Sequence, residues 1–240
     1  MKVTILQTDI VWADPEANLE RLDKQFAELP EADLFVLPEM FTTGFATRPE
    51  GIAESKGVGL EWMKSMAVSR NCAIAGSIAT EEDGKYYNRF YFVTPDKVWQ
   101  YDKHHLFTYS GEHHHFTPGT EKVIAEWRGV RFRLAVCYDL RFPVWLRNED
   151  PAYDALVVVA SWPEKRADAW KSLLKARAIE NQCYVIGVNR IGDDPSCHYS
   201  GDSAFLDAFG KEATEIDMEA LKAFREQFPV LKDADKFETV

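Results

Sequence analysis

The sequence predicts an α/β fold in which two mixed β-sheets pack as a sandwich with helices outside. Apolar, strand-like segments alternate with amphipathic, helix-like segments along most of the 240 residues. Two pairs of strand-like segments are separated only by short turns, Asp83-Gly84 and Arg128-Gly129, and such hairpins break the strict alternation of a parallel sheet. No linker, repeat or low-complexity stretch interrupts the pattern, so residues 1–240 are interpreted as a single domain.

The first half of the chain is expected to alternate strands and helices before it forms a hairpin. Asp14 precedes Pro15, and this pair suits the N-cap and first position of a helix. A short apolar strand then ends at Pro38. The expected elements are strands 3–8, 33–37, 72–80, 88–94 and 98–101, and helices 15–29 and 57–70.

The second half is expected to hold the most deeply buried strands. Residues 130–136 alternate in character with period 2, and residues 155–160, ALVVVA, are continuously apolar, as is typical of a strand covered on both faces. Apolar residues recur at helical spacing from Trp170 to Ile179. The expected elements are strands 122–127, 130–136, 155–160, 184–189 and 203–207, a helix after Pro163 and a helix at 218–228.

Bulk composition narrows the function classes. The net charge of −11 would repel a phosphate backbone, so nucleic acid is not expected as a partner. No apolar run approaches the length of about 18 residues that a membrane span requires, and the first residues do not resemble a signal peptide. None of the four cysteines forms a CxxC pair. We therefore expect a cytoplasmic protein with reduced thiols and no membrane partner.

Three predicted strands end in residues that packing alone does not explain. Glu39 follows the second strand after a proline, Lys103 follows the strand at 98–101, and Cys137 follows the strand that begins at Val130. Active sites in layered α/β folds gather where strands end and loops begin. A carboxylate can take a proton from a thiol, and an ammonium can stabilise the oxyanion that follows attack on a carbonyl. Taken singly, a glutamate after a strand is more typical of a solvated loop, a lysine of the surface and a cysteine of core packing.

Around these residues the sequence resembles the nitrilase superfamily of carbon–nitrogen hydrolases. The resemblance covers nearly the whole chain and rests on the segments FVLPEMFTTGF, YDKHHLF, AVCYDLRFP, VVVASWP, KARAIENQCYVIGVNRIG and YSGDSAFLDAFG. It implies a four-layer αββα sandwich. It also implies a catalytic triad of Glu39, Lys103 and Cys137, with Glu112 in SGEHHHF as a second glutamate. The backbone N–H of Tyr138 would complete an oxyanion hole beside the lysine.

Two of these segments, SWP and ARAIENQCYVIGVNRIG, most resemble the ω-amidase branch. The resemblance implies a small-molecule substrate, the monoamide of a short 2-oxo dicarboxylic acid such as 2-oxoglutaramate or 2-oxosuccinamate. Its terminal amide would be cleaved through a thioester on the cysteine, with release of ammonia. Neither a metal nor an organic cofactor is needed for this chemistry. The superfamily usually pairs subunits, so a homodimer is also implied.

Specificity requires a cation for the distal carboxylate. Arg166, near the start of the helix after Pro163, is the first candidate, although a solvated arginine on a helix fits the sequence equally well. The expected pocket walls are Phe41, Tyr109 and Trp162. Arg141 is expected to join Asp139 in bracing the turn that carries the nucleophile.

The sequence also permits other functions. The triad is common to carbamoyl-amine, peptide-amide and nitrile branches, so it does not choose among their substrates. Five histidines between positions 104 and 115 could supply a Cys–His hydrolase or a metal site, but His113–His115 are consecutive and lack the i, i+4 spacing of a helical zinc pair. The role of this histidine run stays undetermined. A non-enzymatic scaffold would be favoured only if a triad member were missing.

Overall fold

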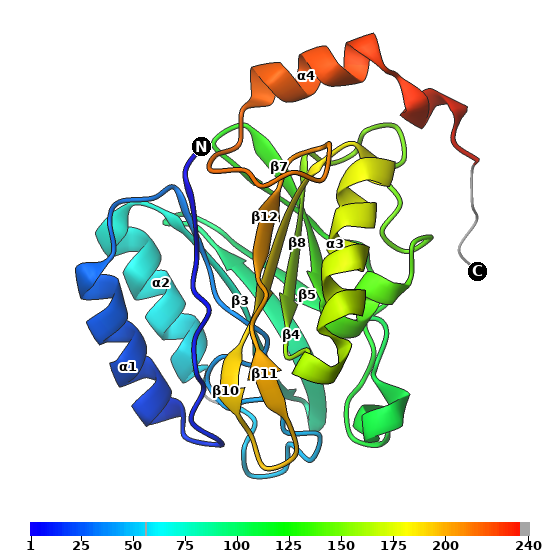
Figure 1. Cartoon of the computed structure of the whole chain (residues 1–240). Helices are drawn as coiled ribbons and strands as arrows, with labels where there is room; N and C mark the ends of the chain where they lie inside the picture. The colour runs from blue at the N-terminus through cyan, green and yellow to red at the C-terminus, as the bar shows by residue number, and fades with distance from the viewer. Residues whose placement is uncertain (56, 236–240) are drawn as a thin grey trace.

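The computed structural model, which describes residues 1–55 and 57–235, contains two five-stranded sheets packed face to face between layers of helices (Figure 1). The expected α/β class and αββα order of layers are confirmed. The prediction that residues 1–240 form a single domain stays a prediction.

The first sheet has the strand order β1-β2-β3-β4-β5. The strands β1, β2 and β3 are parallel, and the β3–β4 and β4–β5 pairs are antiparallel. A helical crossover separates the parallel strands, whereas the turn at Asp83-Gly84 joins β3 directly to β4, as predicted. The bounds are β1 Val3–Ile5, β2 Leu34–Val36, β3 Ala73–Glu82, β4 Lys85–Val93 and β5 Val98–Asp102.

The second sheet has the order β12-β9-β8-β7-β6. Its central strands β7, β8 and β9 are parallel, and each edge strand pairs antiparallel to its neighbour. The bounds are β6 Ile124–Trp127, β7 Val130–Val136, β8 Ala155–Ala160, β9 Tyr184–Asn189 and β12 Ala204–Leu206. The predicted bounds of β7, β8 and β9 are confirmed, because their apolar patterns begin and end sharply.

The residues that the structure describes form four α-helices. The bounds are α1 Pro15–Glu28, α2 Val58–Arg70, α3 Ala167–Asn181 and α4 Met218–Gln227. Helices α1 and α2 lie outside the first sheet, α3 lies outside the second, and α4 lies across one end of the molecule (Figure 1). Asp14 caps α1 by accepting a hydrogen bond from the backbone N–H of Ala17, which confirms the predicted start of this helix. Among the described residues, every helix is too short or too polar to cross a bilayer.

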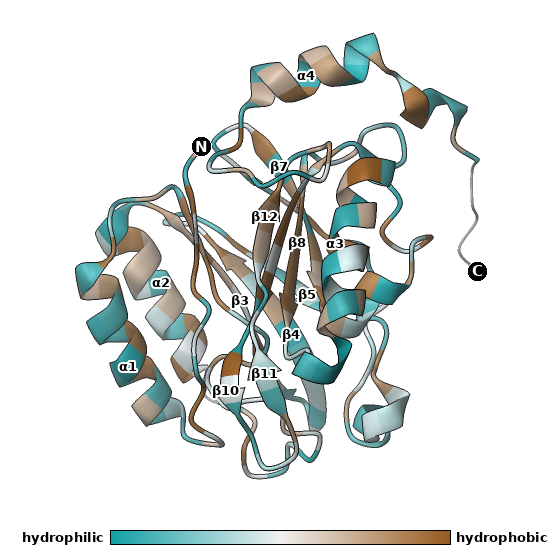
Figure 2. Cartoon of the chain, viewed as in Figure 1, coloured by the Kyte–Doolittle hydropathy of each residue, from teal (hydrophilic) through white to brown (hydrophobic). Residues whose placement is uncertain are grey.

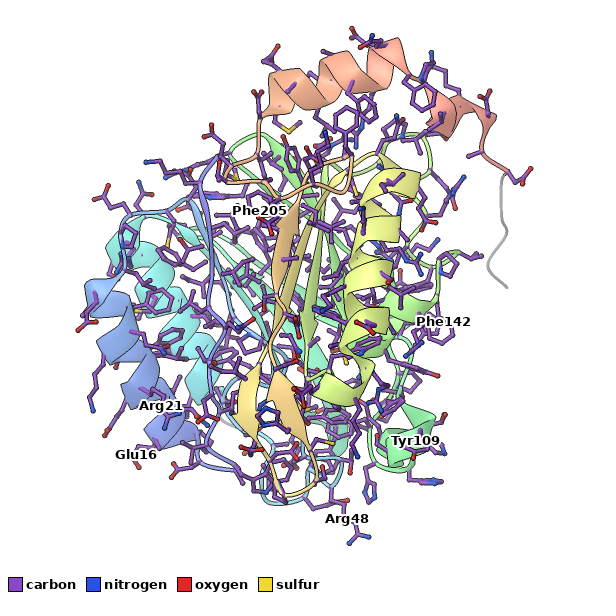
Figure 3. All side chains as sticks on the ribbon, in the orientation of Figure 1. Glu16, Arg21, Arg48, Tyr109, Phe142 and Phe205 are labelled. Atoms are coloured by element: carbon purple, nitrogen blue, oxygen red, sulfur yellow. The ribbon has the colours of Figure 1, made fainter. Side chains whose placement is uncertain are left out.

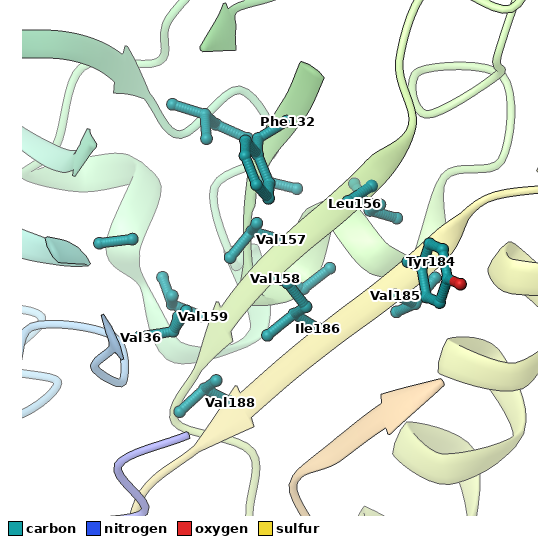
Figure 4. Close-up of a cluster of buried hydrophobic side chains, with 14 of the residues drawn as sticks. Val36, Phe132, Leu156, Val157, Val158, Val159, Tyr184, Val185, Ile186 and Val188 are labelled. Atoms are coloured by element: carbon teal, nitrogen blue, oxygen red, sulfur yellow. The ribbon is translucent and has the colours of Figure 1, made fainter. Parts of the chain in front are cut away.

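Apolar side chains fill both faces of each sheet because successive side chains of a strand point to opposite faces. In β2, Leu34 and Val36 face the second sheet, whereas Phe35, and Leu37 directly after the strand, pack beneath α1 and α2. Strand β8 is buried along its whole length and appears brown in the hydropathy view (Figure 2). Figure 4 shows buried apolar side chains of β7, β8 and β9 clustered together in the core. This packing fixes the two sheets against each other and therefore aligns the strand ends that carry polar residues.

Several elements differ from the sequence prediction. Strand β1 ends at Ile5, earlier than the predicted residue 8, and the chain then continues as a loop in which Asp9 forms an isolated bridge with Ile191. A two-stranded hairpin was missed because its segments are short and polar; its strands are β10 Ile191–Asp193 and β11 His198–Ser200. Within the described residues, four short 3₁₀ turns were also missed: η1 Thr108–Ser110, η2 Glu112–His114, η3 Cys137–Arg141 and η5 Val230–Asp233. The helix predicted after Pro163 begins as a fifth 3₁₀ turn, η4 Glu164–Arg166, before α3.

Candidate active site

The polar strand ends meet at one edge of the sandwich. Strands β2 and β5 point in the same direction because the antiparallel strand β4 lies between β5 and β3, so Glu39 and Lys103 emerge together. Strands β7 and β8 are parallel, and they deliver Cys137 and Ser161 from the second sheet. The backbone N–H of Ser161 donates to Glu39 Oε2 over 2.8 Å, which joins the two sheets at this point.

Lys103 is fully buried and lies between two fully buried glutamates. Its Nζ is 3.0 Å from Glu39 Oε1 and 2.9 Å from Glu112 Oε2. Burial alone would lower the pKa of the ammonium, but the charges of Glu112 and Glu39 outweigh burial and raise its pKa above the ordinary value. The lysine therefore carries a positive charge at neutral pH despite its dry surroundings.

Neutral donors hold the two carboxylates in place. Asn88 in β4 donates from Nδ2 to Glu39 Oε1 over 2.8 Å and contacts Glu112 Oε1 at 3.3 Å. Ser77 donates to Asn88 Oδ1 and thereby fixes the orientation of the amide. The backbone N–H of Phe107 donates to Glu112 Oε2 over 2.6 Å. Burial raises the pKa of Glu112, and Lys103 opposes that rise.

Cys137 lies in a strained turn directly after β7. Its φ is +45°, a left-handed conformation that few residues other than glycine adopt, and it begins the 3₁₀ turn η3. Burial of the thiol raises its pKa well above the ordinary value, because a thiolate would lose its hydration. The charge of Glu39 raises the pKa further, and the charge of Lys103 lowers it. The cluster already carries two carboxylates and one ammonium, so a thiolate would add a second uncompensated negative charge.

A cavity of about 550 Å³ opens above Cys137. Its wall includes the predicted residues Trp162, Tyr109 and Tyr138. Trp162 is buried, whereas Tyr109 is 88% exposed and lies at the lower right of the molecule (Figure 3). Further wall residues come from the N-terminal loop, the segment at 45–52 and the β10–β11 hairpin: Trp12, Phe45, Ala46, Thr47, Arg48, Ile52, Pro195, Ser196, Cys197 and Tyr199.

Phe41 is a correction to the predicted pocket wall. It is 1% exposed and packs in the cluster beneath α1 and α2, with its ring 6.1 Å from that of Trp62. The preceding residue, Met40, has a φ of +46°, so the chain turns sharply after Glu39. Phe45 lines the cavity instead, and its ring lies 5.1 Å from Lys103 Nζ.

Arg166 and Arg141 both line the cavity. The guanidinium of Arg166 lies 5.3 Å from the ring of Phe107, and that of Arg141 lies 4.9 Å from the ring of Trp162. The expectation that Arg141 braces the turn with Asp139 is wrong, since Arg141 is exposed along the cavity wall. Within residues 1–55 and 57–235, neither arginine forms an ion pair with a carboxylate, so both can meet an anion in the cavity.

The five histidines from His104 to His115 are not among the residues that line the cavity. His115 pairs with Glu50 through Nδ1 at 2.7 Å, and His113 stacks on His114. His104 and His105 stack instead on aromatic residues that follow the nucleophile turn. In the described part of the chain, no three His, Cys, Asp or Glu side chains form a group that could hold a metal ion.

Comparison with known proteins decides the family. The carbon–nitrogen hydrolase family model matches residues 2–222. The chain belongs to the carbon–nitrogen hydrolase family. It is 45% identical to the omega-amidase YafV of Yersinia enterocolitica, with 99% of this chain and 98% of the relative covered. It is 35% identical to a 2-oxoglutaramate amidase of Bacillus subtilis, with 98% and 99% covered.

A solved structure in this superfamily has the same fold throughout. The protein XC1258 of Xanthomonas campestris, a CN-hydrolase superfamily protein with an arsenic adduct in its active site, superposes with a TM-score of 0.95 at 37% identity. The superposition covers 100% of this chain and 99% of that one. These findings show a hydrolase that acts on carbon–nitrogen bonds.

Sequence reasoning missed several residues of this hydrolase site. Asn88 was overlooked; it is a polar residue directly before the long apolar run of β4 and the first fully buried residue of that strand, which is a usable signal. Cys197 and Tyr199 reach the cavity only because the β10–β11 hairpin folds over it, and nothing in their local sequence indicates that approach.

The first prediction concerns the protonation state of Cys137. A raised pKa keeps a thiol protonated below that pKa, so Cys137 in the free enzyme should carry its proton at neutral pH. The far-ultraviolet absorbance of thiolate should therefore be the same in the wild type and in Cys137→Ala at pH 7. A thiolate signal that disappears in Cys137→Ala would instead show a preformed ion pair with Lys103.

Proposed function

We propose that this carbon–nitrogen hydrolase is an ω-amidase that cleaves the terminal amide of a short 2-oxo dicarboxylic acid monoamide. The observation that carries the proposal is the cavity above Cys137, whose wall holds two arginines, Arg141 and Arg166, without carboxylate partners among the described residues. The fully buried Glu39–Lys103–Glu112 cluster lies next to the same thiol. Similarity along 99% of the chain to an omega-amidase, and to a 2-oxoglutaramate amidase, supports this substrate class.

The reaction begins with attack of the Cys137 sulfur on the amide carbon. Because the thiol is protonated in the resting enzyme, Glu39 removes its proton as the new carbon–sulfur bond forms. The negative charge that develops on the carbonyl oxygen is stabilised by the Lys103 ammonium and by the backbone N–H of Tyr138. A fixed ammonium costs no reorganisation at this step, because the two glutamates already hold it in position.

Glu39 then returns the proton to the amide nitrogen, and ammonia leaves as the thioester forms. Water, activated by the same glutamate, attacks the thioester and restores the thiol. Glu112 does not exchange protons in this scheme. It holds Lys103 through two contacts of 3.0 and 2.9 Å and balances part of its charge. These steps require neither a metal nor an organic cofactor.

The distal carboxylate binds between Arg141 and Arg166. Guanidinium groups that lie over aromatic rings keep their N–H donors free at the edge, where they can form charge-assisted hydrogen bonds. The corresponding amino acid carries a positively charged ammonium in place of the 2-oxo group. That ammonium would lie near the two arginines, and no Asp or Glu is among the lining residues to pair with it. The pocket therefore favours a 2-oxo acid over the corresponding amino acid.

A substrate panel with ammonia detection tests the proposed function. The panel contains 2-oxoglutaramate, 2-oxosuccinamate, glutamine, carbamoylputrescine, a nitrile and a neutral amide of matched length, with Cys137→Ala as the inactive control. Arg141→Ala and Arg166→Ala should each raise KM for 2-oxoglutaramate about 10- to 100-fold, because each removes hydrogen bonds worth roughly 1.5–3 kcal/mol. They should change KM for the neutral amide little.

The matched control is Arg21→Ala, which removes the same charge from the surface of α1. Equal kcat/KM on 2-oxoglutaramate and the neutral amide would contradict the ω-amidase proposal and leave a cysteine amidase of another preference.

A second experiment separates the Glu–Lys–Cys mechanism from a Cys–His mechanism. Glu39→Gln and Lys103→Ala should each lower kcat by at least about 10³-fold, since base and oxyanion donor act with the nucleophile as one unit. The triple change of His113, His114 and His115 to Asn should lower kcat less than about tenfold, because these side chains lie away from the cavity. An active Lys103→Ala enzyme beside an inactive triple variant would establish the Cys–His mechanism instead.

The proposal also includes a homodimer. Exposed apolar side chains gather beside α3 and α4, where Ile179 and Phe209 are 47% and 53% exposed. The ring of Phe209 lies 4.2 Å from that of Phe224. Burial against a second copy would remove this surface from water. Light scattering should give twice the mass of one chain for the wild type. A dissociated Phe209→Asp variant would support this interface, and a monomeric wild type would contradict it.

The cytoplasm is the proposed location. All four cysteines, Cys72, Cys137, Cys183 and Cys197, are free thiols in the structure, and the mechanism needs a reduced nucleophile. Recovery of the protein in the cytoplasmic fraction of expressing cells is the expected result, and recovery outside that fraction would contradict the proposal.

A further inference from the structure

We propose that Asp139 is a positioning residue that fixes the Cys137 nucleophile relative to Lys103 by tying together the two chain segments that carry them. The two catalytic groups come from different sheets, Lys103 from the end of β5 and Cys137 from the end of β7. Their separation therefore depends on how the two sheets meet at this edge. The inference rests on Cys137 as the nucleophile of the proposed function, but not on which amide it attacks.

The carboxylate of Asp139 accepts hydrogen bonds from both sides of Lys103 in the sequence. Tyr101, two residues before the lysine, donates its hydroxyl to Oδ2 over 2.8 Å. His105, two residues after it, contacts Oδ1 through its backbone N–H and its ring Nδ1, each at 2.9 Å. One carboxylate thus holds the lysine segment at two points that flank the catalytic side chain.

The same carboxylate holds the cysteine segment. Asp139 Oδ2 accepts from the backbone N–H of Val136 over 3.0 Å, directly before the nucleophile. This bond closes a short loop around Cys137, whose φ of +45° is strained and must be maintained by its surroundings. Loss of the bond would let the turn relax and move the thiol away from Lys103 and Glu39.

Aromatic stacking reinforces the tie. The ring of His105 stacks on Phe142, which ends the nucleophile turn, at 3.7 Å and an angle of 5°. The ring of His104 stacks on Trp145 at 3.7 Å and 7°. Trp145 also donates from Nε1 to the Tyr101 hydroxyl over 3.0 Å. Two consecutive residues of the lysine segment are thereby packed against the segment that follows the cysteine.

An ionised carboxylate suits this position better than a neutral group. Asp139 is fully buried and receives four donors, which its two oxygens can accept at once. Burial alone would raise its pKa, but the hydrogen bonds from His105, Val136 and Tyr101 outweigh burial and lower it. An amide of the same shape would present an NH₂ group to donors and lose at least one of these contacts.

The test is Asp139→Asn in the full chain. A misplacement of about 1 Å can cost about 100-fold in rate, so kcat should fall about 100-fold with KM within about threefold of the wild type. The rate at which iodoacetamide alkylates Cys137, followed by mass spectrometry, should also fall about tenfold, because the thiol would no longer align with its base. This second readout does not depend on the identity of the amide substrate.

The matched control is Asp154→Asn. Asp154 is also buried, and it pairs with Arg131 and Arg225 at the opposite end of the second sheet. This variant should lower the melting temperature while kcat and the alkylation rate stay at wild-type values. A purely structural role for Asp139 predicts instead that both variants lose activity only in proportion to their loss of stability.

His105→Phe keeps the test decisive if Asp139→Asn does not fold. Phenylalanine preserves the stack on Phe142 and the backbone N–H but removes the ring donor, so kcat and alkylation should each fall about tenfold at unchanged KM. Wild-type kcat and alkylation in a folded Asp139→Asn or His105→Phe enzyme would overturn the inference. Slow alkylation in these variants would support it even if the enzyme proved inactive toward 2-oxoglutaramate.

Discussion

The buried ammonium of Lys103 is the interaction on which the rest of the site depends. A charge removed from water must be paired and hydrogen-bonded, and here two glutamates supply that compensation. Each glutamate then needs fixed donors of its own, which Asn88 and two backbone N–H groups provide. Removal of one partner from such a cluster typically costs about 3–5 kcal/mol, so the catalytic groups are also a structural unit.

The sandwich architecture turns this charge cluster into a catalytic site. The first sheet carries Glu39 and Lys103, and the second sheet carries Cys137. Apolar packing between the sheets brings them together but sets no hydrogen-bond geometry. Two directional hydrogen bonds across the same edge supply this geometry: the backbone N–H of Ser161 donates to Glu39, and the backbone N–H of His105 donates to Asp139. Hydrophobic burial therefore assembles the site, and a few polar bonds define its distances.

The Cys137 thiol keeps its proton until the substrate is attacked. Burial raises the pKa of the Cys137 thiol well above its ordinary value, and the charge of Glu39 raises it further against the opposing charge of Lys103, so the thiol resists ionisation. In the proposed mechanism, proton transfer to Glu39 accompanies attack on the substrate, and the resting enzyme holds little free thiolate.

The arginines over Trp162 and Phe107 add local positive charge to a cavity in a protein of net charge −11. The net charge of the surface thus says little about the preferred substrate.

The sequence by itself determined the strands with sharp apolar limits, such as β7 and β8, and the two hairpin turns, because local periodicity and turn residues encode them. It also marked Glu39, Lys103 and Cys137, since each interrupts a pattern that packing would continue. Only the tertiary structure decided which aromatic residues line the cavity. It turned Phe41 into the core, brought Phe45 beside Lys103 and laid Arg141 along the wall. Such placements follow from backbone turns and contacts between distant segments, and short sequence patterns contain neither.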